Sequence, residues 1–187
     1  GSGKTLLAIA AGLEQVVSNE TVMSAAFEGK ISLEGEYKRL IVSRPVQPMG
    51  KDIGFLPGTM EDKMKPWLAP IVDNLKFLTG DDNSTLEMDM DKGIIEMEAL
   101  TYIRGRSIAN SFIIIDEAQN LSRHEVKTIL TRAGEGTKIV LTGDVEQIDN
   151  IYVNETSTGL VHAVERLKRF DIAGHVTLKK GERSKLA

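Results

Sequence analysis

The sequence predicts an α/β fold in which a mostly parallel sheet carries helices on both faces. Short, uniformly apolar segments rich in β-branched residues recur at residues 40–43, 112–115 and 138–142. Strands without polar alternation are typical of sheets that are buried on both sides. Longer segments with apolar residues at helical spacing separate them, and this alternation of strand and helix indicates βαβ units.

The other elements follow from local patterns. Residues 4–17 are apolar nearly all round, which predicts a buried helix. Residues 160–167 have helical spacing, and residues 94–97 and 175–178 are short apolar runs that we interpret as strands. Residues 80–91 are acidic and polar, and we expect an exposed turn region there.

Two capping boxes mark helix starts, because a Ser or Thr is followed three residues later by an acid. The first is Thr59 with Asp62, and the second is Ser122 with Glu125, where Leu121 is placed as the hydrophobic staple. The helix after the first box contains prolines at positions 66 and 70, so we expect it to be kinked or split in two.

Composition describes one soluble globular domain spanning residues 1–187. Of the 187 residues, 41% are hydrophobic and 27% charged, and the net charge of −4 provides no bulk basic field for nucleic acid. The absence of cysteine excludes disulfides and thiolate metal sites and fits a cytoplasmic location. No apolar run approaches the roughly 20 residues of a membrane helix, so no membrane association is expected.

The first motif is half of a phosphate-binding loop. The string GSGKT at residues 1–5 matches the second half of G-x-x-x-x-G-K-[ST], while the first glycine and the strand before it are missing. Backbone N–H groups at the helix start would surround phosphate oxygens, the lysine would reach the β- and γ-phosphates, and the threonine would ligate Mg²⁺. The residues expected to bind nucleotide are Gly1, Ser2, Gly3, Lys4, Thr5 and Leu6. The alternative is a glycine turn that caps an apolar helix.

The second motif, FIIIDEAQN at residues 112–120, places acids at the end of an apolar strand. Ligands of open α/β sheets bind at this edge. Asp116 would hold Mg²⁺ together with Thr5, and Glu117 would polarise an attacking water. The alternative is an acidic helix start without chemistry.

The third motif, TGDVEQID at residues 142–149, follows the next apolar strand. An ATPase can place a polar sensor of the γ-phosphate there, and Gln147 is our candidate. The alternative is a loop in which Gly143 and Asp144 only turn the chain.

Together these motifs resemble the first RecA-like domain of superfamily-one helicases, and more closely the PhoH family of ATPases. The resemblance covers nearly all of the chain, and its most specific part is the string from VSRPVQPMGKDIGFLPG to EDKMKPWLAPIVDNL. This string is similar to the sequences of the subgroup in which a PIN nuclease domain precedes the PhoH domain. The chain would then be an N-terminally truncated PhoH-like P-loop ATPase domain.

The resemblance implies a RecA-type core that hydrolyses ATP with Mg²⁺. It implies that the sensor strand lies between the phosphate-loop strand and the strand ending at Asp116, that Glu117 is the catalytic base and that Gln147 senses nucleotide. Arg183 with Ser184 resembles a helicase pair that reaches the γ-phosphate, and such an arginine can contribute about 10³–10⁵ in rate. The alternative for Arg183 is a solvated side chain.

RNA or single-stranded nucleic acid is the expected partner. Cations in the segments between core strands could contact phosphates, namely Arg44, Lys51, Lys63, Lys65, Arg104 and Arg106. Trp67 and Phe55 could stack on bases, although core packing is the favoured interpretation for both. Arg104 and Arg106 could equally bind ATP phosphates or pair with the acids of residues 80–91.

Two further readings stay open at this point. A P-loop kinase would transfer phosphate to a small acceptor, and a hydrolysis-deficient domain would act only in assembly. Because unwinding normally needs two RecA-like domains, we expect self-association, with a hexameric ring as one arrangement, or a second domain elsewhere. We also expect residues 1–187 alone to bind ATP weakly or not at all, since the sheet lacks a central strand.

Overall fold

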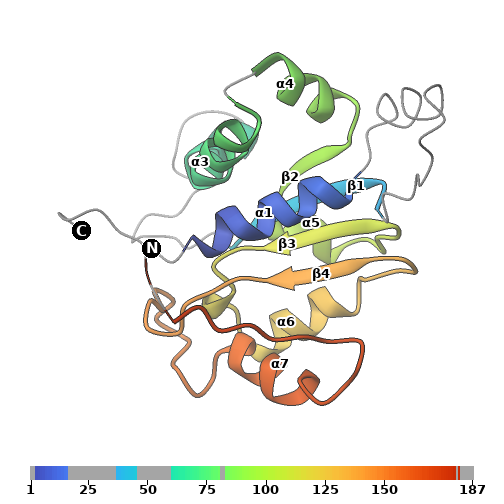
Figure 1. The fold of residues 1–187 in the computed structure, drawn as a ribbon. Coiled ribbons are helices and arrows are strands. Elements are labelled where there is room, and N and C mark those ends of the chain that lie inside the picture. Colours follow the sequence, from blue (N-terminus) through green and yellow to red (C-terminus); the bar gives the residue numbers. More distant parts are fainter. Residues whose placement is uncertain (1–2, 17–36, 46–59, 81–82, 180, 182–187) are drawn as a thin grey trace.

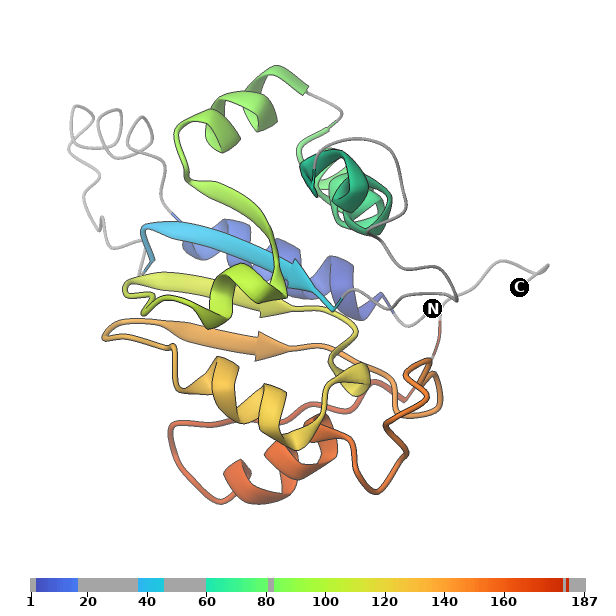
Figure 2. The same ribbon diagram turned by 180° about the vertical axis from the view of Figure 1, so that it is seen from behind.

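The computed structural model describes residues 3–16, 37–45, 60–80, 83–179 and 181, which form a sheet between two layers of helices (Figures 1 and 2). Its strands are β1 (Arg39–Arg44), β2 (Ile95–Ala99), β3 (Ser111–Ile115) and β4 (Lys138–Leu141). Its helices are α1 (Lys4–Gln15), α3 (Met60–Leu78), α4 (Asn83–Asp91), α5 (Leu100–Arg104), the 3₁₀ turn η2 (Ala118–Asn120), α6 (Arg123–Leu130) and α7 (Gly159–Leu167). Within these ranges, no helix is both long enough and apolar enough to cross a bilayer.

The described strands form one parallel sheet in the order β2-β1-β3-β4. The register places Ile113 of β3 opposite Ile41 of β1 on one side and Ile139 of β4 on the other. All of these strands therefore end at the same edge of the sheet, and this edge carries the candidate site. The sensor strand β4 pairs with β3, the strand that ends at Asp116, as expected. Its expected position next to the phosphate-loop strand stays a prediction.

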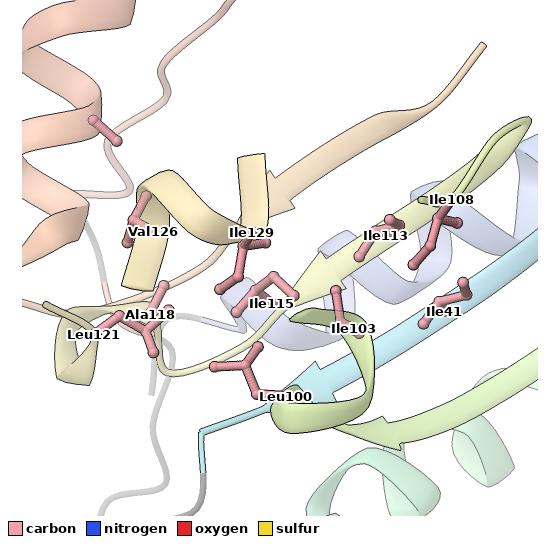
Figure 3. Packing of buried hydrophobic residues seen from close by; sticks show 11 residues of the cluster. Ile41, Leu100, Ile103, Ile108, Ile113, Ile115, Ala118, Leu121, Val126 and Ile129 are labelled. Carbon is pink, nitrogen blue, oxygen red and sulfur yellow. The ribbon is translucent and has the colours of Figure 1, made fainter. Parts of the chain in front are cut away.

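Two apolar clusters cover the two faces of the sheet. Figure 3 shows the first, in which Ile113 and Ile115 of β3 pack against α5 and α6. The second lies on the other face, where Phe112 and Ile114 pack with α1 and α3, and Leu86 of α4 also belongs to it. Successive residues of β3 thus enter opposite clusters, which explains why the strand has no polar alternation.

The capping box at α6 is formed as predicted. Ser122 accepts a hydrogen bond from the Glu125 backbone N–H, and the Glu125 side chain accepts one from the Ser122 N–H. Leu121 and Val126 belong to the same buried cluster, as expected for a staple. The box at Thr59 and Asp62 lies partly outside the described residues, but α3 runs unbroken through Pro66 and Pro70, so it is not split.

Three local predictions were wrong. Residues 83–91 form helix α4 rather than a turn, because Leu86 is buried against the second cluster and anchors a helix. Residues 175–178 form no strand, since Val176 is 80% exposed and no described strand pairs with this segment. Helix α1 is not buried all round, because Ile9 is fully buried while Leu7 is 56% exposed.

Candidate functional site

A glycine turn starts helix α1 at the edge of the sheet where the strands end. Gly3 caps the helix with φ 72° and ψ 12°, a left-handed conformation that glycine adopts at little cost. No atom lies within 4 Å of the position that a Cβ would take, so the turn requires glycine for its backbone angles and not for space. The first-turn N–H groups of Lys4, Thr5 and Leu6 lack partners within the helix, and such groups attract anions.

Asp116 follows β3 and joins the turn to the sheet. Its Oδ1 accepts hydrogen bonds from the Thr5 hydroxyl at 2.8 Å and from the Thr142 hydroxyl at 2.7 Å. The side chain is almost fully buried, and its backbone N–H donates to the Ser43 carbonyl of β1. Three segments that are far apart in the sequence therefore meet at one carboxylate, which is the convergence that the motifs predict.

The oxygens at this point suit Mg²⁺. The Thr5 hydroxyl, the Asp116 carboxylate and the Thr142 hydroxyl are hard oxygen donors, which Mg²⁺ prefers over nitrogen or sulfur. The predicted metal residues, Thr5 and Asp116, are thus in direct contact. In the part of the chain that the structure describes, no group of three His, Cys, Asp or Glu residues forms another potential metal site.

Arg44 lies beside both acids of the motif. Its Nε is 4.0 Å from Asp116 Oδ2, and a terminal nitrogen is 3.4 Å from Glu117 Oε1. The guanidinium therefore offsets the repulsion between two adjacent carboxylates. We expected Arg44 to contact nucleic acid, and this placement was missed. The sequence shows that Arg44 ends an apolar strand, but only the pairing of β1 with β3 places it beside Asp116.

Glu117 has an unusual backbone conformation. Its φ of 55° and ψ of 36° lie in the left-handed region, which is rare for residues other than glycine and is enriched at functional sites. Its Oε2 accepts a hydrogen bond of 2.6 Å from the Gln119 amide, and its other oxygen faces Arg44. Glu117 is therefore held from two sides at the edge of the sheet.

Gln119 and Asn120 tie this turn to the loop after β4. Gln119 is fully buried; its Nε2 also donates to the Gln147 carbonyl at 3.1 Å, and its Oε1 accepts from the Asp144 N–H at 3.2 Å. Asn120 Oδ1 accepts from the N–H groups of Asp149 and Asn150. Sequence reasoning missed both amides, although each stands in the DEAQN string itself.

Gln147 lies next to this network, but its side chain is turned outward. It is exposed and donates to Asp144 Oδ2 at 3.0 Å. Its backbone carbonyl, not its amide, contacts Gln119. The sensor role of Gln147 therefore stays a prediction.

Other predicted site residues are distributed as follows. Lys4 and Leu6 flank Thr5 in the first turn of α1 and are half-buried. Gly1, Ser2 and Arg183 lie outside the described residues. The structure thus brings together Thr5, Asp116 and Glu117, with Lys4 adjacent in the chain.

The proposed nucleic-acid contacts are only partly described. Arg104 pairs with Glu125, and Arg106 pairs with Glu96 and Glu98 at 3.0 and 3.1 Å, so neither pairs with the acids of residues 80–91 in the described region. Trp67 is half-buried, and its carbonyl accepts from Arg44 at 3.5 Å. The side chains of Lys51, Phe55, Lys63 and Lys65 lie outside the described residues.

Comparison with known proteins shows the family of this chain. The family model described as PhoH-like protein matches residues 1–186. The chain belongs to the PhoH family. Membership in the PhoH family indicates a nucleotide-binding ATPase domain of the P-loop class, and the parallel sheet with flanking helices agrees with a RecA-like fold.

Several PhoH relatives are similar over 91–100% of the chain. Protein PhoH2 of Bacillus subtilis is 55% identical over 192 residues, and PhoH2 of Mycolicibacterium smegmatis is 38% identical over 188 residues. Each alignment covers 100% of this chain but only 39% of the relative. A PhoH-like protein of Bacillus subtilis is 37% identical over 171 residues, which is 91% of this chain and 47% of that protein. The chain therefore spans less than half the length of these relatives.

Proposed function

We propose that this PhoH domain hydrolyses ATP with Mg²⁺ and that hydrolysis is coupled to binding or unwinding of RNA or single-stranded nucleic acid within a longer protein of the PIN–PhoH type. The observation that carries the proposal is the 2.8 Å contact between Thr5 and Asp116. It joins the phosphate-loop helix to the acid of the second motif, as a triphosphate and magnesium site requires.

Each residue then has a distinct task. Lys4 and the first-turn N–H groups of α1 bind phosphate oxygens, and Thr5 with Asp116 hold Mg²⁺, which would neutralise charge developing on the phosphates. Glu117 accepts a proton from the attacking water. Gln147 reports the state of the γ-phosphate, and Arg183 stabilises charge in the transition state.

The two side-chain contacts that fix Glu117 support its role as a base. A general base must be aimed at its proton, and Glu117 is fixed by Gln119 on one oxygen and by Arg44 on the other. The same two contacts tie it to β1 and to the loop after β4. Movement of either segment would therefore change the position of Glu117, which is one route by which nucleic-acid binding could alter hydrolysis.

A single RecA-like domain limits how strands could be moved. We propose that motion of nucleic acid requires self-association, for example a six-membered ring, or a second domain of the longer protein. The cytoplasm is the proposed location. The relatives named PhoH2 and PhoH-like carry no statement of substrate in those names, so the nucleic-acid coupling is our own proposal.

The test is phosphate release by the full-length protein with and without single-stranded RNA. We expect RNA to stimulate hydrolysis, and Glu117→Gln to reduce kcat by about 10²–10⁴-fold while ATP still binds. The matched control is Glu135→Gln, a change of the same kind at an exposed acid before β4, at the opposite edge of the sheet. Phosphate transfer to a small molecule would instead indicate a kinase, and tight ATP binding without turnover would indicate an assembly module.

A further inference from the structure

Helices α6 and α7 form a groove on the face of the sheet opposite α1. The groove has a volume of about 330 Å³ and lies between the two helices. Its floor is apolar and consists of side chains that also belong to or pack on the first cluster: Val126, Leu130, Ala163 and Leu167. It is therefore a shallow apolar trough with helical walls.

The rim of this groove is basic. Arg123, Lys127 and Arg166 line it and are exposed. His124 and half-buried His162 also line it. No carboxylate lines the groove within the described residues, and there neither Lys127 nor Arg166 forms an ion pair. This is unusual for a chain whose net charge is −4, and it indicates that an acidic, partly apolar occupant would fit.

Helix α4 presents such a surface. Leu86 is buried, and Met88, which lies about 200° around the helix from it, is 46% exposed. Glu87 and Asp91 are exposed and, being four residues apart, lie next to each other on one side of Met88, while exposed Lys92 lies on its other side. The outer face of α4 is thus a flexible apolar side chain beside a pair of acids.

The two surfaces lie on opposite faces of the sheet and cannot meet within one molecule. Leu86 of α4 belongs to the cluster with α1 and α3, whereas α6 and α7 belong to the other. Figures 1 and 2 show α4 and the α6–α7 pair at opposite ends of the molecule, with the sheet between them. A contact between them has to join two different molecules, and it joins them head to tail.

We propose that the outer face of α4 docks in the α6–α7 groove of a second copy of this chain. Met88 enters the apolar floor, where a methionine adapts readily to an irregular surface. Glu87 and Asp91 face the cations of the rim, principally Lys127 and Arg166. This is recognition of a helix by a groove, and because the contact uses two different surfaces, repetition gives a closed ring or an open filament.

The experiment measures the mass of the full-length protein by sedimentation at low and high salt. We expect an assembly larger than a monomer that dissociates as salt rises, because its rim contacts are ionic. Reversal of the groove (Lys127→Glu with Arg166→Glu) and reversal of the helix (Glu87→Lys with Asp91→Lys) should each lower the average mass at least twofold. The matched control is Lys38→Glu with Arg169→Glu, which reverses two exposed cations outside the groove.

Mixing the two reversed proteins gives the decisive result. In each reversed protein the groove and the α4 face carry charge of the same sign, so copies of it repel each other. In the mixture, the basic helix of one protein meets the acidic groove of the other. The unchanged acidic helix and the unchanged basic groove also match. We expect the mixture to regain the mass of the unmodified protein. A monomeric unmodified protein, an assembly that neither reversal affects, or a mixture that stays dissociated would each overturn the proposal. Loss of RNA binding with unchanged mass in the groove reversal would also overturn it and would assign the groove to nucleic acid.

This inference does not depend on ATP hydrolysis. If the protein hydrolyses ATP but neither charge reversal changes its mass, only the docking proposal is refuted. An inactive protein that shows the expected charge-swap recovery would refute the proposed function alone.

Discussion

The buried amide of Gln119 donates a 2.6 Å hydrogen bond to Glu117, the acid that we assign as the catalytic base. The same amide contacts the Gln147 carbonyl and the Asp144 N–H, so it joins the acid to the loop after β4. Gly143 fits this packing closely, because a Cβ there would lie 2.8 Å from Gln119 Oε1. Gln119 is therefore a positioning residue that acts through Glu117.

Replacement of Gln119 by Glu should change how hydrolysis depends on pH. Two carboxylates within hydrogen-bond distance resist ionising together, so the acidic limb of the kcat profile should move to higher pH. Gln119→Met removes the hydrogen bond at similar size and should lower kcat by about 10–100-fold with a smaller change in KM. The control is Gln15→Glu near the end of α1, and an unmoved acidic limb in Gln119→Glu would contradict the positioning role.

Thr142→Val should destabilise the fold, because Asp116 loses one of its two hydroxyl donors. Asp116 is 2% exposed, and loss of a hydrogen bond to a buried charged group costs about 1.5–3 kcal/mol in the free energy of unfolding. Thr142→Ser keeps the hydroxyl and should retain most of the stability. Urea unfolding of the three proteins measures the effect, and equal values for the Val and Ser variants would speak against this bond.

Glu98→Gln should increase stability at neutral pH relative to the unmodified protein. Burial raises the pKa of Glu98 above its ordinary value of 4.5, Arg106 opposes this by lowering it, and Glu96 raises it further. Its Oε2 is also buried without a partner among the described residues. The raised pKa belongs to the folded state. The free energy of unfolding therefore falls as the pH rises from about 4.5, because ionising Glu98 costs more in the folded than in the unfolded protein.

The measurement is the difference in unfolding free energy between Glu98→Gln and the unmodified protein from pH 4 to pH 8. The difference should grow in favour of the variant from roughly pH 4.5 and then level off at the folded-state pKa. Glu165→Gln is the control of opposite sign, because the hydrogen bond and charge of Lys168 lower the pKa of Glu165. A flat difference for Glu98→Gln would refute the effect of burial.

Gly159→Ala should destabilise the fold by about 1–3 kcal/mol through overpacking. A Cβ at this position would lie 2.4 Å from the Ser122 carbonyl oxygen and 2.5 Å from a Val126 methyl carbon, and the backbone atom cannot move aside cheaply. Gly174→Ala is the control, since nothing lies within 4 Å of its added Cβ. Thermal unfolding of both variants is the measurement, and equal melting temperatures would show that α7 can shift to make room.

Local chemistry in the sequence determined most of the framework. Uniformly apolar runs predicted β1, β3 and β4, the Ser122–Glu125 box predicted the start of α6, and the acid after β3 predicted the site edge. These features depend on residues that are neighbours in the chain, so their physics is readable without a structure. The PhoH resemblance rests on contiguous strings of residues, so it too was readable without a structure. The family match over residues 1–186 confirmed it.

Only the tertiary structure decided which distant groups share a partner. The pairing of Arg44 with Asp116 and Glu117, the burial of Leu86 that makes residues 83–91 a helix, and the exposure of residues 175–178 each depend on segments far away in the sequence. Charge and strand propensity are local properties, whereas the partner that satisfies them is set by the order of the strands in the sheet. For that reason the sequence identified the acids of the site, and the fold identified the arginine and amides that hold them.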